Sequence, residues 1–278
     1  MAKVNLSRTI LVVALLALAV IVLTNLYPVG VDWATFCRAD IMRPHATEGF
    51  ISPPWMLLFL PHRSLSLGVG NAVNLILNIA VLLFAIRKWG GSAFAASLVF
   101  TSPVFFALAL TNNVEWLPLL GLLVDPLFGG VLLSCKPQCL SLAFLIWLKR
   151  DLRVAILPLA VLLFSLVVWG WWPGDVELDL SSKLYNFSIL PVGIPYGIYL
   201  LWIAWREDDA YLAAIATPLF VPYLAPYSLV SVLALLASTR PKAGAWFYLS
   251  LWAFTIIEFR RIGYPSNISP TWPVTSGA

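Results

Sequence analysis

The chain has 278 residues, of which 61% are hydrophobic and 11% are charged, and its mean hydropathy is +0.90. Soluble domains carry roughly 25% charged residues, so this sequence is too apolar to cover a water-facing surface and belongs in a bilayer. The net charge of +4 is small and is better explained by membrane topology than by nucleic-acid binding. Apolar segments recur from Ile10 to Phe259, so residues 1–278 are expected to form a single integral membrane domain.

The first predicted span runs from Thr9 to Tyr27, close to the about 20 residues that cross a bilayer. A signal peptide is the alternative, but the apolar run is long and no clear small-x-small cleavage site follows it. The loop of residues 28–66 comes next and is the longest polar interval. It contains a short apolar insert, residues 51–61, whose paired prolines and tryptophan suit an interfacial or briefly re-entrant segment.

Further along, apolar segments of unequal length are separated by charged or proline-containing breaks. The predicted segments are Leu67–Ile86, Ser92–Leu110, Trp116–Val124, Leu127–Cys135, Cys139–Leu148, Val154–Trp172, Ile189–Trp205, Tyr211–Tyr223, Tyr227–Ala237 and Ala243–Phe259. Proline removes a backbone donor, so Pro118, Pro137 and Pro222 indicate broken helices around a cavity. The predicted fold class is all-α: a polytopic membrane helix bundle of about 9–11 segments, several of them short or broken.

Positive charge is concentrated at alternate ends of these segments. With a cytoplasmic N-terminus, the inner ends hold Lys3, Arg8, Arg87, Lys88, Lys149, Arg150, Arg153, Arg206, Arg240 and Lys242. This agrees with the positive-inside rule and places the loop of residues 28–66 and the tail of residues 260–278 on the extracytoplasmic side of a cytoplasmic (inner) membrane. If residues 127–148 were a single span, the predicted membrane orientation of every later segment would be reversed. Two short helices are preferred there because Lys136-Pro137 would otherwise lie in mid-bilayer.

Asp32 is the sharpest candidate for chemistry, because it lies a few residues beyond the first span. A carboxylate at the membrane surface can serve as the general base that activates a hydroxyl for sugar transfer. The phosphate of a lipid-linked donor needs cations to balance its charge, and the same loop contains Arg38, Arg43 and Arg63, with His45 as a weaker candidate. The alternative is that Asp32 only caps a loop helix.

Two further polar sites interrupt apolar sequence. Lys136 either binds a phosphate or carboxylate at a helix break or extends its ammonium to the interface. The second site comprises Asn112, Asn113 and Glu115. These side chains could bind sugar hydroxyls or a divalent metal. The alternative is a structural turn followed by a helix cap, and the spacing alone favours this alternative. The chain has no His/Cys cluster, Gly-rich nucleotide loop or Ser-His-Asp elbow, so nucleotide-driven pumping and soluble-type hydrolysis are poorly supported.

Five short motifs follow one another in a characteristic order. They are Val31-Asp32-Trp33-Ala34-Thr35-Phe36, Ser52-Pro53-Pro54-Trp55-Met56-Leu57, Thr111-Asn112-Asn113-Val114-Glu115-Trp116-Leu117, Cys135-Lys136-Pro137-Gln138 and Val221-Pro222-Tyr223-Leu224-Ala225-Pro226-Tyr227-Ser228. Together they resemble the glycosyltransferase-C superfamily, in particular its polyprenyl-phosphate-mannose-dependent mannosyltransferase-like family. The family's Gly-Gln turn reads Asn112-Asn113 here and its late aspartate is Ser228, and the chain is shorter than typical members.

The resemblance implies transfer of a sugar from a polyprenyl-phosphate donor to a hydroxyl of a glycan, lipid or protein acceptor, on the extracytoplasmic side. Asp32 would be the general base. The donor phosphate would be bound by residues among Lys136, Arg38, Arg43, Arg63 and His45. The sugar or acceptor pocket would be lined by Asn112, Asn113, Glu115, Trp55, Gln138, Tyr223 and Tyr227. The resemblance demands no cofactor, although a divalent metal is compatible with it, because the leaving group is an already charged lipid phosphate.

Two other classes of protein fit the composition. A lipid or solute transporter would need ionisable residues along a path to the inside, whereas here they cluster in the predicted outer loop. The other alternative is a non-catalytic relative or a membrane scaffold. The sequence alone does not separate mannose, glucose, galactose and arabinose donors.

Overall fold

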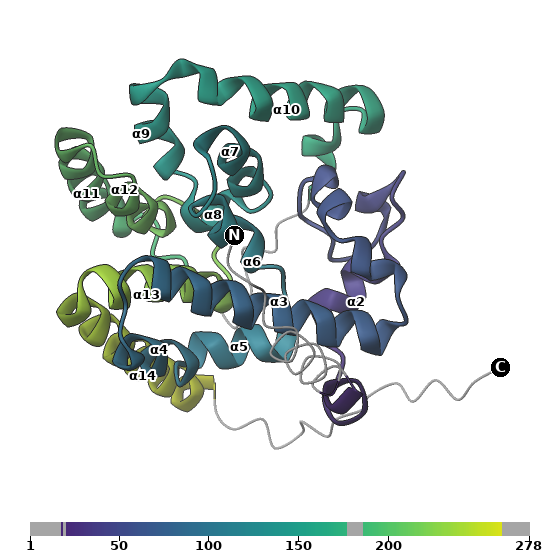
Figure 1. Cartoon of the computed structure of the whole chain (residues 1–278), viewed down its shortest axis with the longest axis horizontal. Coiled ribbons are helices and arrows are strands. Elements are labelled where there is room, and N and C mark those ends of the chain that lie inside the picture. Colours follow the sequence, from purple (N-terminus) through teal and green to yellow (C-terminus); the bar gives the residue numbers. More distant parts are fainter. Residues whose placement is uncertain (1–17, 19–20, 177–185, 263–278) are drawn as a thin grey trace, which may run out of the picture.

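The structure, a computed structural model, describes residue 18, residues 21–176 and residues 186–262 (Figure 1). Within these ranges every regular element is an α-helix or a 3-10 helix, and no strand occurs. The predicted all-α class is confirmed. Most of the predicted first span, Thr9–Tyr27, lies outside the described residues, as does the tail after Ile262.

Most of the described helices are short, and the longest, α3 and α14, have 22 residues each. The α-helices are α2 (Val31–Arg38), α3 (Leu67–Lys88), α4 (Ala93–Phe100), α5 (Pro103–Thr111), α6 (Trp116–Gly121), α7 (Pro126–Ser134), α8 (Pro137–Leu140), α9 (Ala143–Arg150), α10 (Ile156–Trp169), α11 (Gly193–Glu207), α12 (Ala210–Ala216), α13 (Leu229–Thr239) and α14 (Pro241–Ile262). The 3-10 helices are η1 (Pro44–Ala46), η2 (Pro54–Phe59), η3 (Pro61–Ser64), η4 (Leu152–Ala155), η5 (Trp172–Asp175), η6 (Thr217–Leu219) and η7 (Pro226–Ser228).

Two described helices are long and apolar enough to cross a membrane: α3, and the continuous stretch Leu152–Trp169 that contains α10. A third span results if α4 and α5 are counted together, although they are bent by 59°. The two helices cover the segment predicted over Ser92–Leu110, and the bend divides that segment in two. Its cause is local, because Pro103 opens α5 and the Ser102 hydroxyl accepts from the Phe105 amide at 3.1 Å, which makes a new helix start.

The break predicted at Lys136-Pro137 is confirmed. Residues 126–150 form α7, α8 and α9 in succession, and Lys136 is the residue that precedes α8. Pro137 occupies the first position of α8, where a missing backbone donor costs nothing. The apolar insert of the first loop is mostly helical in the structure. It forms η2, whose Trp55, Met56 and Leu57 are buried in a protein core.

A small hydrophobic cluster of Ile146, Ala204, Leu212 and Ala213 joins α9 to α11 and α12, and two more extensive cores hold the rest of the described bundle together. The larger one lies between α3, α4, α9 and α13, and the smaller one joins α2 and η2 to α6 through Trp33, Met56 and Leu117. α10 belongs to neither core over most of its length: 11% of the Leu152–Trp169 stretch is buried. Its exposed apolar side chains, including Leu163 and Val167, form a surface suited to lipid.

In Figure 1, α10 runs along the top of the view and α3 runs across it lower down, with α6, α7 and α8 between them, α2 toward one side and α11 and α12 toward the other. α3 has 22 residues and is therefore about 33 Å long. α3 and α10 each run between two separate polar regions of the molecule, one beside α2 and one beside α12.

Candidate functional site

Asp32 lies in the first turn of α2, a helix that begins directly after Gly30. Trp33 and Phe36 anchor this helix in the smaller core, and the Asp32 side chain is half-buried. The residue before α2 is Gly30 and no side chain caps the helix, so Asp32 is not the cap that the simpler interpretation of the sequence required. Its charge is nevertheless favourable at the positive end of a helix.

The Asn113 side chain joins Asp32 to the interior of the bundle. Its amide nitrogen donates to Asp32 Oδ2 at 2.8 Å and to the Tyr227 hydroxyl at 2.9 Å. Its amide oxygen accepts from Lys136 Nζ at 2.8 Å and from the Val114 amide at 2.7 Å. Both donors and both lone pairs of the amide are used, so its orientation is fixed.

Behind Asn113 lies a buried ion pair between Lys136 and Glu115, whose side chains are 3% and 1% exposed. Glu115 also accepts from the Ser228 hydroxyl at 3.2 Å and from the Cys139 thiol at 3.3 Å. The Lys136 ammonium lies 4.8 Å from the centre of the Tyr227 ring. Buried charges are costly unless they are paired and hydrogen-bonded, and here every partner is provided.

We call Asp32, Asn113, Glu115, Lys136 and Tyr227 the Asp32 network. Sequence positions far apart converge in it, and four of the five motifs quoted above contribute to it. Lys136 lies at the helix break before α8 and binds a carboxylate there, that of Glu115. The alternative, in which its ammonium extends to the interface, does not match, because the side chain is buried.

A ladder of asparagines on α3, which sequence reasoning missed, holds the turn that carries Asn113. The Asn74 amide nitrogen donates to Asn112 O at 2.9 Å, and the Asn78 amide nitrogen donates to Asn113 O at 2.7 Å. Asn78 Oδ1 accepts from the Trp116 amide at 3.0 Å, so the ladder binds backbone on both sides of Glu115. The available signal was a set of asparagines three and four residues apart in an otherwise apolar helix.

The third member of the ladder, Asn71, ties this turn to the chain before α2. Its side-chain oxygen accepts from the Gly30 amide at 3.0 Å and from the Asn112 amide nitrogen at 2.7 Å. Its own nitrogen donates to Pro28 O at 3.2 Å. Asn112 is fully buried and adopts the left-handed conformation with φ 52°, so its side chain is internal rather than open to a sugar.

The arginines of the first loop have separate positions. Arg63 donates to Phe36 O at 3.2 Å and to Ala39 O at 2.8 Å, so it caps the end of α2. Arg38 is exposed and donates to Ala34 O at 3.3 Å. Arg43 and His45 line a pocket of about 480 Å³ beside the end of α10.

The remaining predicted pocket residues differ in accessibility. Trp55 is 4% exposed and lies in the smaller core, so it serves packing here. Gln138 and Tyr223 are half-buried. Tyr223 lies near Tyr227, a member of the Asp32 network.

His62 packs against the ladder and against α2. Its ring stacks on Trp33 at 4.7 Å between ring centres, and its Nε2 is 3.4 Å from Asn74 Oδ1. Because that oxygen can only accept, Nε2 carries the hydrogen. Burial lowers the pKa of His62 below its usual range, since the charged form is poorly solvated there.

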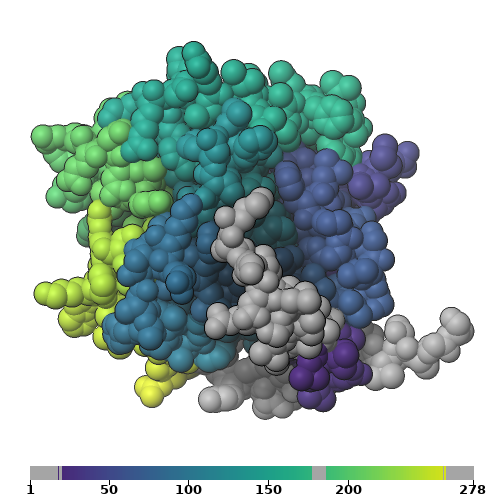
Figure 2. All heavy atoms as spheres, viewed as in Figure 1, coloured from purple at the N-terminus to yellow at the C-terminus, as the bar shows by residue number. Residues whose placement is uncertain are grey.

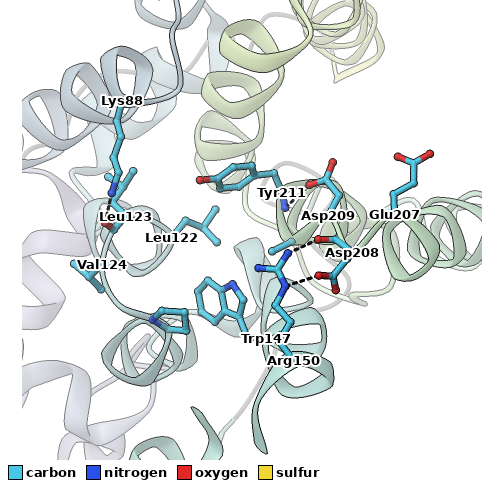
Figure 3. Close-up of a pocket in the computed structure, with 12 residues that line it drawn as sticks. Lys88, Leu122, Leu123, Val124, Trp147, Arg150, Glu207, Asp208, Asp209 and Tyr211 are labelled. Atoms are coloured by element: carbon cyan, nitrogen blue, oxygen red, sulfur yellow. Dashed lines mark hydrogen bonds and ion pairs between the residues drawn. The ribbon is translucent and has the colours of Figure 1, made fainter. Parts of the chain in front are cut away.

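A second polar region lies at the other end of α3. Arg150 Nε donates to Asp208 Oδ2 at 2.7 Å, and Arg240 lies 3.2 Å from Asp209. The Lys88 ammonium donates to Leu123 O at one edge of a pocket of about 650 Å³, which Figure 3 shows between Lys88, Tyr211 and Arg150. We call Lys88, Arg150, Asp208, Asp209 and Arg240 the Asp208 cluster.

Comparisons of the chain with protein-family models, curated proteins and solved structures found no match. Within the described ranges, no group of three or more His, Cys, Asp or Glu side chains is arranged to hold a metal ion.

Proposed function

We propose that the chain is an integral membrane glycosyltransferase with a glycosyltransferase-C-like fold. It transfers a sugar from a polyprenyl-phosphate donor to an acceptor hydroxyl on the extracytoplasmic side of the cytoplasmic membrane. The observation that supports this best is the half-buried carboxylate of Asp32, which the Asn113 amide holds at the edge of a buried ion pair.

In the proposed reaction, Asp32 takes the proton of the acceptor hydroxyl. The acceptor oxygen forms the new bond to the anomeric carbon, the bond from that carbon to the phosphate oxygen breaks, and polyprenyl phosphate leaves with the electron pair. Asn113 sets the direction of the carboxylate. Lys136 acts through Asn113: it donates to the amide oxygen and so fixes the amide nitrogen that donates to the Asp32 carboxylate.

The donor phosphate is assigned to Arg38, because its guanidinium is exposed and holds only a carbonyl of its own helix. Arg63 and Lys136, which the sequence also suggested, are engaged in internal contacts. Arginine suits this role since its planar group binds phosphate oxygens in pairs.

The proposed topology is supported by the separation of the two polar regions. The Asp32 network and the first loop lie beside one end of α3 and α10. The Asp208 cluster contains Lys88, Arg150 and Arg240, which the charge distribution assigned to the inner side. The residues predicted to be extracytoplasmic therefore lie at one end of α3 and α10, and those predicted to be cytoplasmic lie at the other end.

The test uses the full chain in lipid nanodiscs, with polyprenyl-phosphate mannose, glucose, galactose and arabinose as donors. Release of free polyprenyl phosphate is measured for the wild type, Asp32→Asn and the control Asp40→Asn. Asp40 is an exposed carboxylate of the same loop, and its cap on the Met42 amide survives as asparagine.

Asp32→Asn keeps the shape of the side chain and removes the base, so the rate should fall by about 10²–10⁴-fold while Asp40→Asn stays active. Equal rates in the two variants, or no release by the wild type with any donor, would contradict the proposal.

A further inference from the structure

The pocket beside the end of α10, which Arg43 and His45 line, lies on the same side of the molecule as Asp32 but is separate from the Asp32 network. It has a volume of about 480 Å³ and is lined by Met42, Arg43, His45, Trp169, Gly174 and Asp175, among others. It forms where the first loop meets the end of α10 and η5. In Figure 2 this junction is seen as blue-violet atoms of the first loop against the green-teal atoms of α10. Pockets of this size hold small ligands.

The pocket's aromatic walls are held in place before any ligand binds. Trp169 Nε1 donates to Ile41 O at 2.7 Å, which fixes the indole at the end of α10. His45 stacks on Trp172 with 5.7 Å between ring centres and 7° between planes. A prearranged wall lowers the entropy lost on binding.

His45 also presents a defined hydrogen-bonding character. Its Nε2 lies 3.1 Å from Ser52 O, and a carbonyl can only accept, so Nε2 carries the hydrogen. Burial lowers the pKa of His45 below its usual range, which keeps the ring neutral and Nδ1 an acceptor.

Arg43 and Asp175 carry opposite charges and line the same pocket, but they form no ion pair. Among the described residues, neither side chain has a hydrogen-bond partner, and both are exposed. An anion would be repelled by Asp175 and a cation by Arg43. A neutral ligand that both donates and accepts hydrogen bonds satisfies the two together.

We infer that this pocket binds a neutral saccharide. Sugar hydroxyls donate to Asp175 and accept from Arg43, and the C–H face of a sugar ring packs on the half-buried indole of Trp169. Binding here goes beyond the proposed transfer reaction, because it needs no donor lipid and no base.

The experiment measures binding to the full chain in nanodiscs made of sugar-free lipids, after removal of all glycoside detergent. The probes are methyl glycosides of mannose, glucose, galactose and arabinose disaccharides. A disaccharide containing glucuronic acid and one containing glucosamine serve as the anionic and cationic comparisons. Saturation-transfer NMR titrations give the dissociation constants.

Three variants remove the proposed contacts: Arg43→Ala, Asp175→Ala and Trp169→Leu. Arg87→Ala and Trp171→Leu are the matched controls, since Arg87 is exposed at the end of α3 and Trp171 is 74% exposed, and neither lines the pocket. Because Arg43 and Asp175 are exposed, their replacement leaves folding intact.

We expect at least one neutral disaccharide to bind saturably. Each pocket variant should weaken its binding about 5-fold or more, and each control less than about 2-fold, as expected for loss of one good contact of 1–2 kcal/mol. Absence of binding by every neutral probe overturns the inference. So does tighter binding of either charged probe, or unchanged affinity in both Arg43→Ala and Asp175→Ala.

Discussion

The two ends of α3 hold charged groups in opposite physical settings. At one end, the Asp32 network buries Lys136 and Glu115 and surrounds them with amides and hydroxyls. At the other end, the Asp208 cluster pairs its charges where side chains are 28–49% exposed. Exposed pairs contribute little because water and salt screen them, whereas a buried pair is costly and strongly dependent on each partner. A buried pair next to a half-exposed carboxylate therefore indicates function more strongly than an exposed cluster around a larger pocket.

The largest effect should come from breaking the buried pair on one side. Glu115→Gln leaves the Lys136 ammonium buried without its counter-charge, so the free energy of unfolding should fall by about 3–5 kcal/mol. Thermal and denaturant unfolding in nanodiscs measure the change. Glu48→Gln, an exposed carboxylate of the first loop, is the control and should behave as wild type.

The double variant Glu115→Gln with Lys136→Met sharpens this prediction. Removing both charges should restore much of the stability lost in Glu115→Gln, because no unpaired charge remains. A double variant as unstable as the single one would show that packing, and not charge, sets the cost.

The next effect concerns the asparagine ladder. Asn78→Ala leaves the Asn113 carbonyl and the Trp116 amide without their buried partner, and unfolding free energy should fall by about 1–3 kcal/mol. If the ladder positions Asn113, transfer activity should also fall. Asn25→Ala is the matched control, because Asn25 is exposed and bonds only to a carbonyl of its own helix.

Acidification should weaken the first loop more than the Asp208 cluster. Burial lowers the pKa values of His45 and His62, so the unfolded chain binds more protons than the folded one below about the ordinary pKa of 6.5. Stability should then fall as pH drops from about 7 toward 5. His62→Gln, which keeps a donor for Asn74, should flatten this dependence of the thermal midpoint. An unchanged slope in that variant would show that His62 protonation does not contribute.

The smallest effect should come from the Asp208 cluster. Arg150→Gln or Asp208→Asn removes an exposed pair, and the thermal midpoint should change by no more than the error of its measurement. Any change should shrink further at high salt, because screening acts on exposed charges. A change as large as that of Glu115→Gln would invalidate the contrast between the two ends.

Several features of the fold follow directly from the sequence. α3 begins at Leu67, as its apolar pattern predicts, and ends two residues later than expected. The break before Pro137 follows from the chemistry of a lysine and a proline in an apolar stretch. Asp32, Asn113 and Lys136 were each identified as candidates by composition and motif, and the structure brings them together.

Other features depend on contacts that no local pattern reveals. The sequence around Arg63 does not reveal whether its side chain is free or caps α2. It caps α2 because η3 packs beside that helix. The burial of Lys136 depends on Glu115, twenty-one positions earlier in the chain. Asn74 and Asn78 are too few to alter the hydropathy of α3, although their spacing marks a common helix face.

Gly30 has a mechanical consequence. A Cβ atom at this position would lie 2.3 Å from the Thr111 carbonyl oxygen, so two stretches of main chain are in direct contact there. Asn71 bonds to the chain on both sides of that contact. The start of α2 and the turn after α5 therefore move as one rigid unit. Any displacement of Asp32 on ligand binding must carry Asn113 with it, and the distance between carboxylate and amide is conserved during such a motion.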